Sequence, residues 1–156
     1  MFLFLLALTL ISPGFSYDTN DFNFAYFWSK KPQIVLCDDA KVTKKNLEHA
    51  ISFWKHVGLD INTDIVEKTC TTEFAEGEIR ITHQRDLHLE KYYGYTEMEI
   101  DGIVLHAALI TIEDAFHRDL QLLVHELGHA FGIDHEIVDH SHIMHTLVME
   151  EDTRWR

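Results

Sequence analysis

The chain has 156 residues, with 26 Asp and Glu against 13 Lys and Arg and a formal net charge of −13. A nucleic-acid partner requires a positive face, so this balance argues against nucleic-acid binding. No Pro-, Gly- or Ser-rich stretch, charge block or repeat divides the sequence. We therefore expect one domain with a sizeable core.

The first sixteen residues, MFLFLLALTLISPGFS, contain an apolar run that ends before Pro13 and Gly14. This pattern is typical of a secretory signal peptide, which predicts removal of residues 1–16, a mature domain of residues 17–156 and an extracellular location. A membrane-spanning helix needs about 20 apolar residues, so we expect no stable membrane insertion. No Lys or Arg precedes the run, and a buried N-terminal segment is the alternative interpretation.

The first elements of the mature chain alternate between strands and a helix. Residues 33–37, QIVLC, read as a strand behind Pro32. From Thr43 as a plausible N-cap, apolar residues recur at helical spacing until Gly58 stops the helix. Residues 59–67 and 77–82 alternate as two further strands, which predicts a βαβ start and a partly parallel sheet.

The chain contains two cysteines, Cys37 and Cys70. In an exported chain an isolated pair indicates one disulfide, which would stabilise the fold by about 4 kcal/mol in the chain-entropy model. A metal-binding role is the alternative, but neither cysteine has a second Cys or a His at the short spacing of a zinc knuckle.

The second half begins with a polar, tyrosine-rich segment in which residues 92–99, YYGYTEME, predict a short edge strand. Residues 103–112, IVLHAALITI, are apolar enough for a buried strand. From Asp114 onward, helical spacing predicts a second helix that stops at Gly132. The stretch HELGHAFGIDH, residues 125–135, therefore forms the end of a buried helix and the turn beyond it.

This stretch has the spacing of a metal site. Residues four apart lie on one face of a helix, so His125 and His129 can offer two imidazoles to one ion. Gly132 can adopt the left-handed conformation that ends a helix, which lets His135 return to the same point as a third ligand. Three neutral imidazoles suit one Zn²⁺ and leave a fourth position open for water, which indicates catalysis rather than scaffolding.

Glu126 is placed as the general base of such a site. It lies about 100° around the helix from His125 and about 60° from His129, so its carboxylate can lie beside the metal without occupying it. Zn²⁺ lowers the pKa of a bound water, and Glu126 can take its proton and pass it to a leaving amine. The five fixed positions of the motif arise by chance in roughly 2–3 of 10,000 chains of this composition, so the pattern is specific.

The motif H-E-x-x-H-x-x-G-x-x-H resembles that of the metzincin metalloproteases, and SHIMH supplies the methionine, Met144, that this family places in a tight turn beneath the metal. The resemblance implies an α+β fold: a twisted, mixed, mostly parallel sheet with an antiparallel edge strand, two long helices, an active-site helix carrying HExxH, and a short C-terminal subdomain with the Met-turn. It also implies a monomeric, secreted zinc endopeptidase with one catalytic ion. Its polypeptide substrate would bind in extended form along the edge strand.

From Trp28 onward the order of elements resembles the small matrixin-type catalytic domain. The acidic residue after the third histidine is also similar to the astacins, but Thr146 stands where that group has a metal-binding tyrosine, so the matrixin-like interpretation is favoured. The chain departs from the matrixin pattern in two ways. No cysteine-containing prosegment precedes the first strand, and few residues follow Met144, which predicts a shallow or flexible pocket wall.

Two other functions fit the same motif: a non-catalytic zinc-binding module that binds a protein partner, and a zinc hydrolase that acts on a small amide. The remaining polar clusters are expected to lie in surface loops and turns rather than to bind metal. They are His140, His142, His145, His83, Asp86, His88, Asp38 and Asp39.

Overall fold

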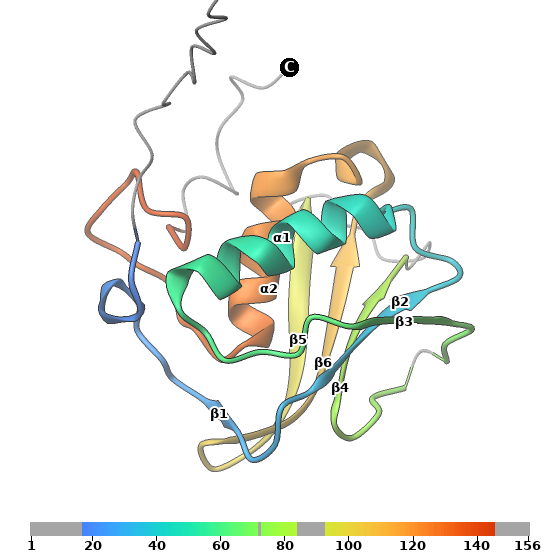
Figure 1. Ribbon diagram of the computed structural model, residues 1–156, viewed down its shortest axis with the longest axis horizontal. Helices are drawn as coiled ribbons and strands as arrows, with labels where there is room; N and C mark the ends of the chain where they lie inside the picture. Colours follow the sequence, from blue (N-terminus) through green and yellow to red (C-terminus); the bar gives the residue numbers. More distant parts are fainter. Residues whose placement is uncertain (1–16, 72, 84–92, 146–156) are drawn as a thin grey trace, which may run out of the picture.

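The computed structural model describes residues 17–71, 73–83 and 93–145 (Figure 1). In these residues a mostly parallel sheet carries two α-helices, which makes a mixed α/β fold. The elements in chain order are η1 (Thr19–Asp21), β1 (Phe27–Trp28), β2 (Gln33–Cys37), α1 (Lys44–Val57), β3 (Ile65–Lys68), β4 (Glu78–Thr82), β5 (Gly94–Asp101), β6 (Val104–Ile112), η2 (Asp114–Phe116) and α2 (Leu120–Ala130).

The sheet has the strand order β1-β6-β4-β2-β3, and every neighbouring pair in this order is parallel. Strands β2 and β3, joined through α1, form the predicted βαβ unit. β5 pairs antiparallel with β6 alone among the described strands, so it lies at the edge of the sheet, as residues 92–99 predicted. The coarse fold expected from the sequence is therefore confirmed.

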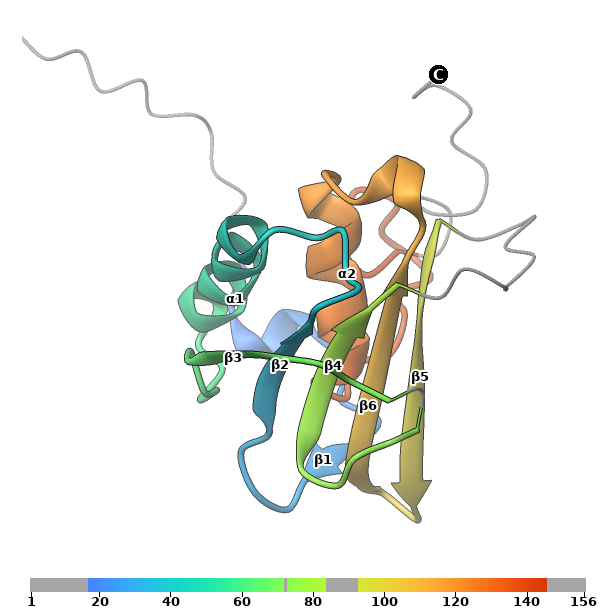
Figure 2. The same ribbon diagram turned by 90° about the vertical axis from the view of Figure 1, so that its right-hand side faces the viewer.

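Both helices pack on the same face of the sheet (Figure 2) and enclose one hydrophobic core. Trp54 of α1 is fully buried at its centre, and its indole Nε1 donates a hydrogen bond to the Val124 carbonyl of α2 at 2.8 Å. This bond satisfies the one polar atom of a large buried ring and fixes α1 against α2. The ends of α1 agree with prediction, because the Thr43 side chain caps its first turn and Gly58 ends it at φ 109°.

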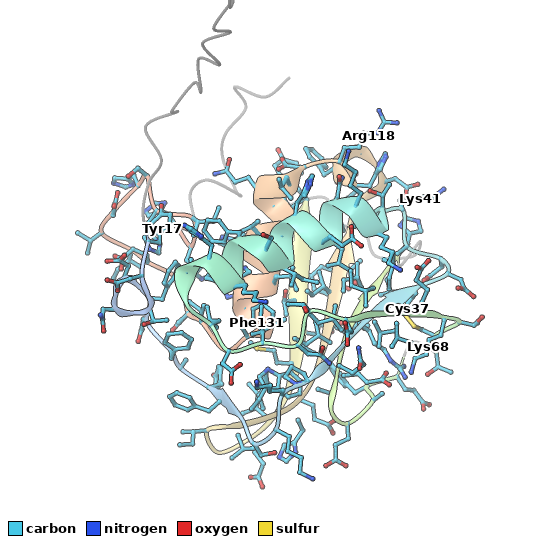
Figure 3. All side chains as sticks on the ribbon, in the orientation of Figure 1. Tyr17, Cys37, Lys41, Lys68, Arg118 and Phe131 are labelled. Carbon is cyan, nitrogen blue, oxygen red and sulfur yellow. A yellow bond between two sulfur atoms is a disulfide. The ribbon has the colours of Figure 1, made fainter. Side chains whose placement is uncertain are left out.

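Cys37 and Cys70 form a disulfide in the structure. Cys37 ends β2 opposite Lys68 of β3, and Figure 3 labels these two residues side by side. Nearby, the Arg80 guanidinium of β4 bonds Glu78 at 2.8 Å and the Glu73 carbonyl at 2.9 Å. The second of these contacts holds Glu73, in the loop between β3 and β4, against the sheet.

The main differences from the sequence prediction are two element starts and one additional strand. The strand expected over residues 59–67 begins only at Ile65, because the Asn62 side chain accepts the backbone N–H of Asp64 at 3.0 Å and forms a local turn. The second helix begins at Leu120 rather than after Asp114, because Asp119 provides its N-cap. The two-residue strand β1 was not predicted.

Within the described part of the chain, no helix combines the length and the apolar character needed to cross a membrane. The predicted signal peptide, residues 1–16, lies outside the described residues, as do Asp86, His88, Thr146 and the rest of the expected pocket wall.

Candidate metal centre

Helix α2 carries the first two histidines of the motif into the protein interior. Its first turn is capped by Asp119, whose side chain accepts the Leu122 N–H at 3.0 Å. His125 and His129 lie one turn apart, and their Nε2 atoms approach to 3.1 Å. The side chain of His125 is almost completely buried, whereas His129 is partly exposed.

The turn after α2 depends on Gly132, as predicted. Its φ is 92°, in the left-handed region, and a Cβ there would meet the Tyr26 carbonyl oxygen at 2.2 Å. The approach is this close because the Gly132 carbonyl accepts the backbone N–H groups of Ala25 at 2.9 Å and Tyr26 at 3.1 Å. The N-terminal segment, residues 17–28, therefore holds the turn in place, and the two segments lie side by side in Figure 1.

The turn brings His135 back to the helix. The backbone N–H of Asp134 donates to the Asn23 carbonyl at 2.8 Å, which fixes the chain just before the third histidine. The Nε2 atom of His135 then lies 3.0 Å from that of His129. Among the residues that the structure describes, His125, His129 and His135 form the only group of three or more side chains that could hold a metal ion together.

Backbone carbonyls determine where the protons of two of these rings lie. His125 Nδ1 lies 2.7 Å from the Ile143 carbonyl, and His129 Nδ1 lies 2.8 Å from the Ile133 carbonyl. A carbonyl only accepts, so each Nδ1 carries the proton and, in the neutral ring, each Nε2 keeps a free lone pair. The two Nε2 atoms therefore face each other as acceptors without a hydrogen between them.

Burial favours the neutral form of both rings. Burial is the main reason that the pKa of His125 is lowered to about 3, and the neighbouring His129 contributes to this lowering. Burial also lowers the pKa of His129 to about 4, with a further lowering from His135. Neutral imidazoles with converging lone pairs are the donor set that binds Zn²⁺. Nε2 atoms of a tetrahedral zinc site would lie about 3.3 Å apart, close to the observed 3.0 and 3.1 Å. The residues thus fit a zinc ion.

Glu126 follows His125 on α2 and has only 4% of its surface exposed. Burial raises the pKa of its carboxyl group to about 7, against the lowering effect of a hydrogen bond from Thr96. The Thr96 hydroxyl lies 2.7 Å from Glu126 Oε2 and 3.0 Å from the Glu126 carbonyl. A carboxyl group with a pKa near neutrality can both accept and release a proton under physiological conditions.

Met144 lies in a turn closed by the His145 N–H, which donates to the His142 carbonyl at 3.0 Å. Its side chain is fully buried against α2, where a Cβ on Gly128 would meet the Met144 sulfur at 2.5 Å and the Trp54 ring at 2.7 Å. Gly128 therefore provides the space for Met144 beneath the helix. The same turn supplies the Ile143 carbonyl that binds His125, so it contributes to the orientation of this candidate metal ligand.

The surface-loop expectation is wrong for two of the other histidines. His142 and His145 are 5% and 2% exposed, while His140 is exposed. The ring of His142 is covered by two aromatic rings of the N-terminal segment, Tyr17 at 5.0 Å and Phe22 at 4.9 Å between centroids. This cover comes from a segment more than a hundred residues away, which local sequence could not reveal.

The Asp38 and Asp39 carboxylates lie in the predicted turn, where they bind the hydroxyl groups of Thr69 and Thr82. His83 Nδ1 lies 3.1 Å from an Asp114 carboxylate oxygen. Neither pair belongs to a group of three metal-ligand side chains among the described residues.

Sequence reasoning missed the side chain that contacts the candidate base. Thr96 lies on a strand whose partly buried face otherwise carries apolar residues such as Met98 and Ile100. A lone hydroxyl on such a face needs a polar partner, and this was the available signal.

No protein-family model matches the chain, and no curated protein matches it in sequence.

Proposed function

We propose that this protein is a secreted zinc-dependent endopeptidase of the metzincin type, with a matrixin-like catalytic domain. The observation that carries the proposal is the convergence of three imidazole Nε2 atoms beside a buried glutamate on the same helix. In this proposal His125, His129 and His135 hold one Zn²⁺, and Glu126 is the general base.

A zinc ion in such a site supplies a water of lowered pKa and polarises the substrate carbonyl. The chain's own contribution to catalysis is proton transfer by Glu126. Because burial raises its pKa to about 7, the carboxylate can take a proton from the water and then give it to the leaving amine at neutral pH. The backbone carbonyls on His125 and His129 keep the imidazoles in the tautomer that binds metal.

A polypeptide is the substrate class that the sheet edge favours. β5 pairs with β6 on one side, and no other described strand pairs with it. The backbone groups of an edge strand can bind an extended peptide as an added strand. The disulfide is consistent with an oxidising compartment and therefore with the proposed secretion.

The test is hydrolysis of a mixed quenched-peptide library by the mature chain, with and without a zinc chelator. Glu126→Gln is the matched variant, because it keeps the shape of the side chain and removes the base. We expect cleavage at internal peptide bonds that requires zinc and falls by at least about a hundredfold in the variant.

Zinc bound at one ion per chain, without cleavage of any peptide by the unmodified protein, would contradict the endopeptidase proposal. That result would favour the non-catalytic zinc-binding module. Turnover of small amides but not of peptides would favour the hydrolase alternative.

A further inference from the structure

We propose that Thr96 is a positioning residue, whose hydroxyl group orients the Glu126 carboxylate for proton transfer. The Thr96 hydroxyl contacts both the carboxylate and the backbone carbonyl of Glu126, and Thr96 lies on a different element of the fold. The consequence for catalysis rests on the proposed function, whereas the contact itself can be measured without turnover.

The register of the sheet places Thr96 on the side of α2. Thr96 lies opposite Ile110 in the antiparallel pair of β5 and β6, and Met98, two residues further on, packs against the hydrophobic core. Side chains two apart share one face of a strand, so Thr96 also points inward. The exposed Glu97 between them points to the other face. An inward hydroxyl among apolar neighbours is stable only with a partner.

Both acceptors of the Thr96 hydroxyl belong to Glu126. The distance is 2.7 Å to the carboxylate oxygen Oε2 and 3.0 Å to the backbone carbonyl. A hydroxyl has one proton, and an ionised carboxylate is a stronger acceptor than a carbonyl. The proton therefore goes to Oε2 whenever Glu126 is ionised, and this bond limits rotation of the carboxylate about its last torsion.

The second carboxylate oxygen is left for the reaction. Among the hydrogen bonds of the described residues, the one from Thr96 is the only one that reaches the Glu126 carboxylate. Oε1 is therefore available to the proton of a reacting water, and the plane of the group is set by the bond at Oε2. Because β5 is also the edge strand, the element that would bind a peptide backbone also orients the base.

A purely structural role is the competing explanation, since the bond to the Glu126 carbonyl alone would attach β5 to α2. Two variants separate the explanations. Thr96→Val keeps the shape and removes the hydroxyl, whereas Thr96→Ser keeps the hydroxyl and removes the methyl group. Thr69→Val is the matched control, because Thr69 also donates to a carboxylate, that of Asp38, near the opposite edge of the sheet.

We expect Thr96→Val to lower kcat about tenfold with KM unchanged, because the lost contact acts on proton transfer rather than on peptide binding. Thr96→Ser should restore kcat to within about threefold of the unmodified protein, and Thr69→Val should not change it. Melting temperatures measured in parallel report any structural loss. A Thr96→Val enzyme with unchanged kcat would overturn the inference, as would equal losses of kcat in the valine and serine variants.

A second measurement does not depend on activity. In zinc-loaded protein labelled with ¹³C at the glutamate Cδ, the Glu126 resonance is identified by its disappearance in Glu126→Gln. It should shift in Thr96→Val and return toward its original position in Thr96→Ser. If the unmodified protein cleaves no peptide, the proposed function fails and this resonance decides the positioning: a shift that serine reverses supports it, and an unchanged resonance in Thr96→Val overturns it.

Discussion

Burial of Glu126 has a thermodynamic consequence that can be measured without a substrate. Its carboxyl pKa is raised from the ordinary value of 4.5 to about 7, chiefly by burial. Between these two values the folded chain holds a proton on Glu126 that the unfolded chain has released. The free energy of unfolding therefore falls as the pH rises through this window.

Glu126→Gln removes this titration and keeps the shape of the side chain. A shift from 4.5 to about 7 corresponds to about 3 kcal/mol at 1.36 kcal/mol per pH unit. In metal-free protein, the variant should therefore gain about 3 kcal/mol over the unmodified chain as the pH rises from about 4.5 to about 8. The gain should be complete above about pH 8 and absent below about pH 4.5.

The assay is urea denaturation at pH steps across this range, with a chelator present and with the free energy of unfolding extrapolated to water. Lowered histidine pKa values also make the fold less stable in acid, but His125 and His129 are present in both proteins and their effect cancels in the difference. Glu99→Gln, at an exposed site on β5, controls for the loss of a formal charge. A difference between the Glu126→Gln and unmodified proteins that does not change with pH would refute the reasoning.

Three further predictions concern the turn, the disulfide and the metal. Gly132→Ala should lower the free energy of unfolding by about 3 kcal/mol in the same denaturation assay, because the new side chain combines a positive φ with a clash against Tyr26. Gly102→Ala is the control, since Gly102 has φ 60° and a Cβ there meets nothing within 4 Å. This control should cost only about 1 kcal/mol. Replacing Cys37 and Cys70 by serine removes a cross-link between residues 33 apart and should lower the free energy of unfolding by about 4 kcal/mol. A loss below about 1 kcal/mol would contradict the expected constraint on the unfolded chain. Zinc at about 1,000 times its Kd should stabilise the protein against unfolding by about 4 kcal/mol, and calorimetry should show one ion bound per chain. His135→Ala should abolish this stabilisation, whereas the control His49→Ala on α1 should keep it.

Local signals in the sequence were sufficient where an element depends on its own residues. The ends of α1 could be predicted because Thr43 caps its first turn and Gly58 takes the left-handed conformation after it. The start of α2 could not, since Asp114 and Asp119 are equally good N-caps in isolation. The structure uses Asp119, while the carboxylate of Asp114 lies beside His83. β1 exists only through its pairing with β6, so no local pattern indicates it.

The candidate site also combines residues whose placement the sequence predicts with residues whose placement it does not. The spacing of His125, His129 and His135 follows from helix geometry and one glycine, so the sequence alone predicted their convergence. The carbonyl of Ile143 lies 18 residues from the ring that it binds, and Thr96 lies 30 residues from Glu126. Such partners are set by packing between elements, and no sequence period encodes them.

The contact between the N-terminal segment and the end of α2 also affects the order of folding. The indole of Trp28 donates to the Ala130 carbonyl across 102 residues, and Ala25 and Tyr26 bind the turn that carries the third histidine toward the other two. Contacts between such distant parts of a chain form late, because the large loop between them must close first. The turn that carries His135 is therefore fixed in its final position only late in folding. In the proposed enzyme, metal binding would then accompany the completion of folding, and a partly made chain would have no hydrolytic centre.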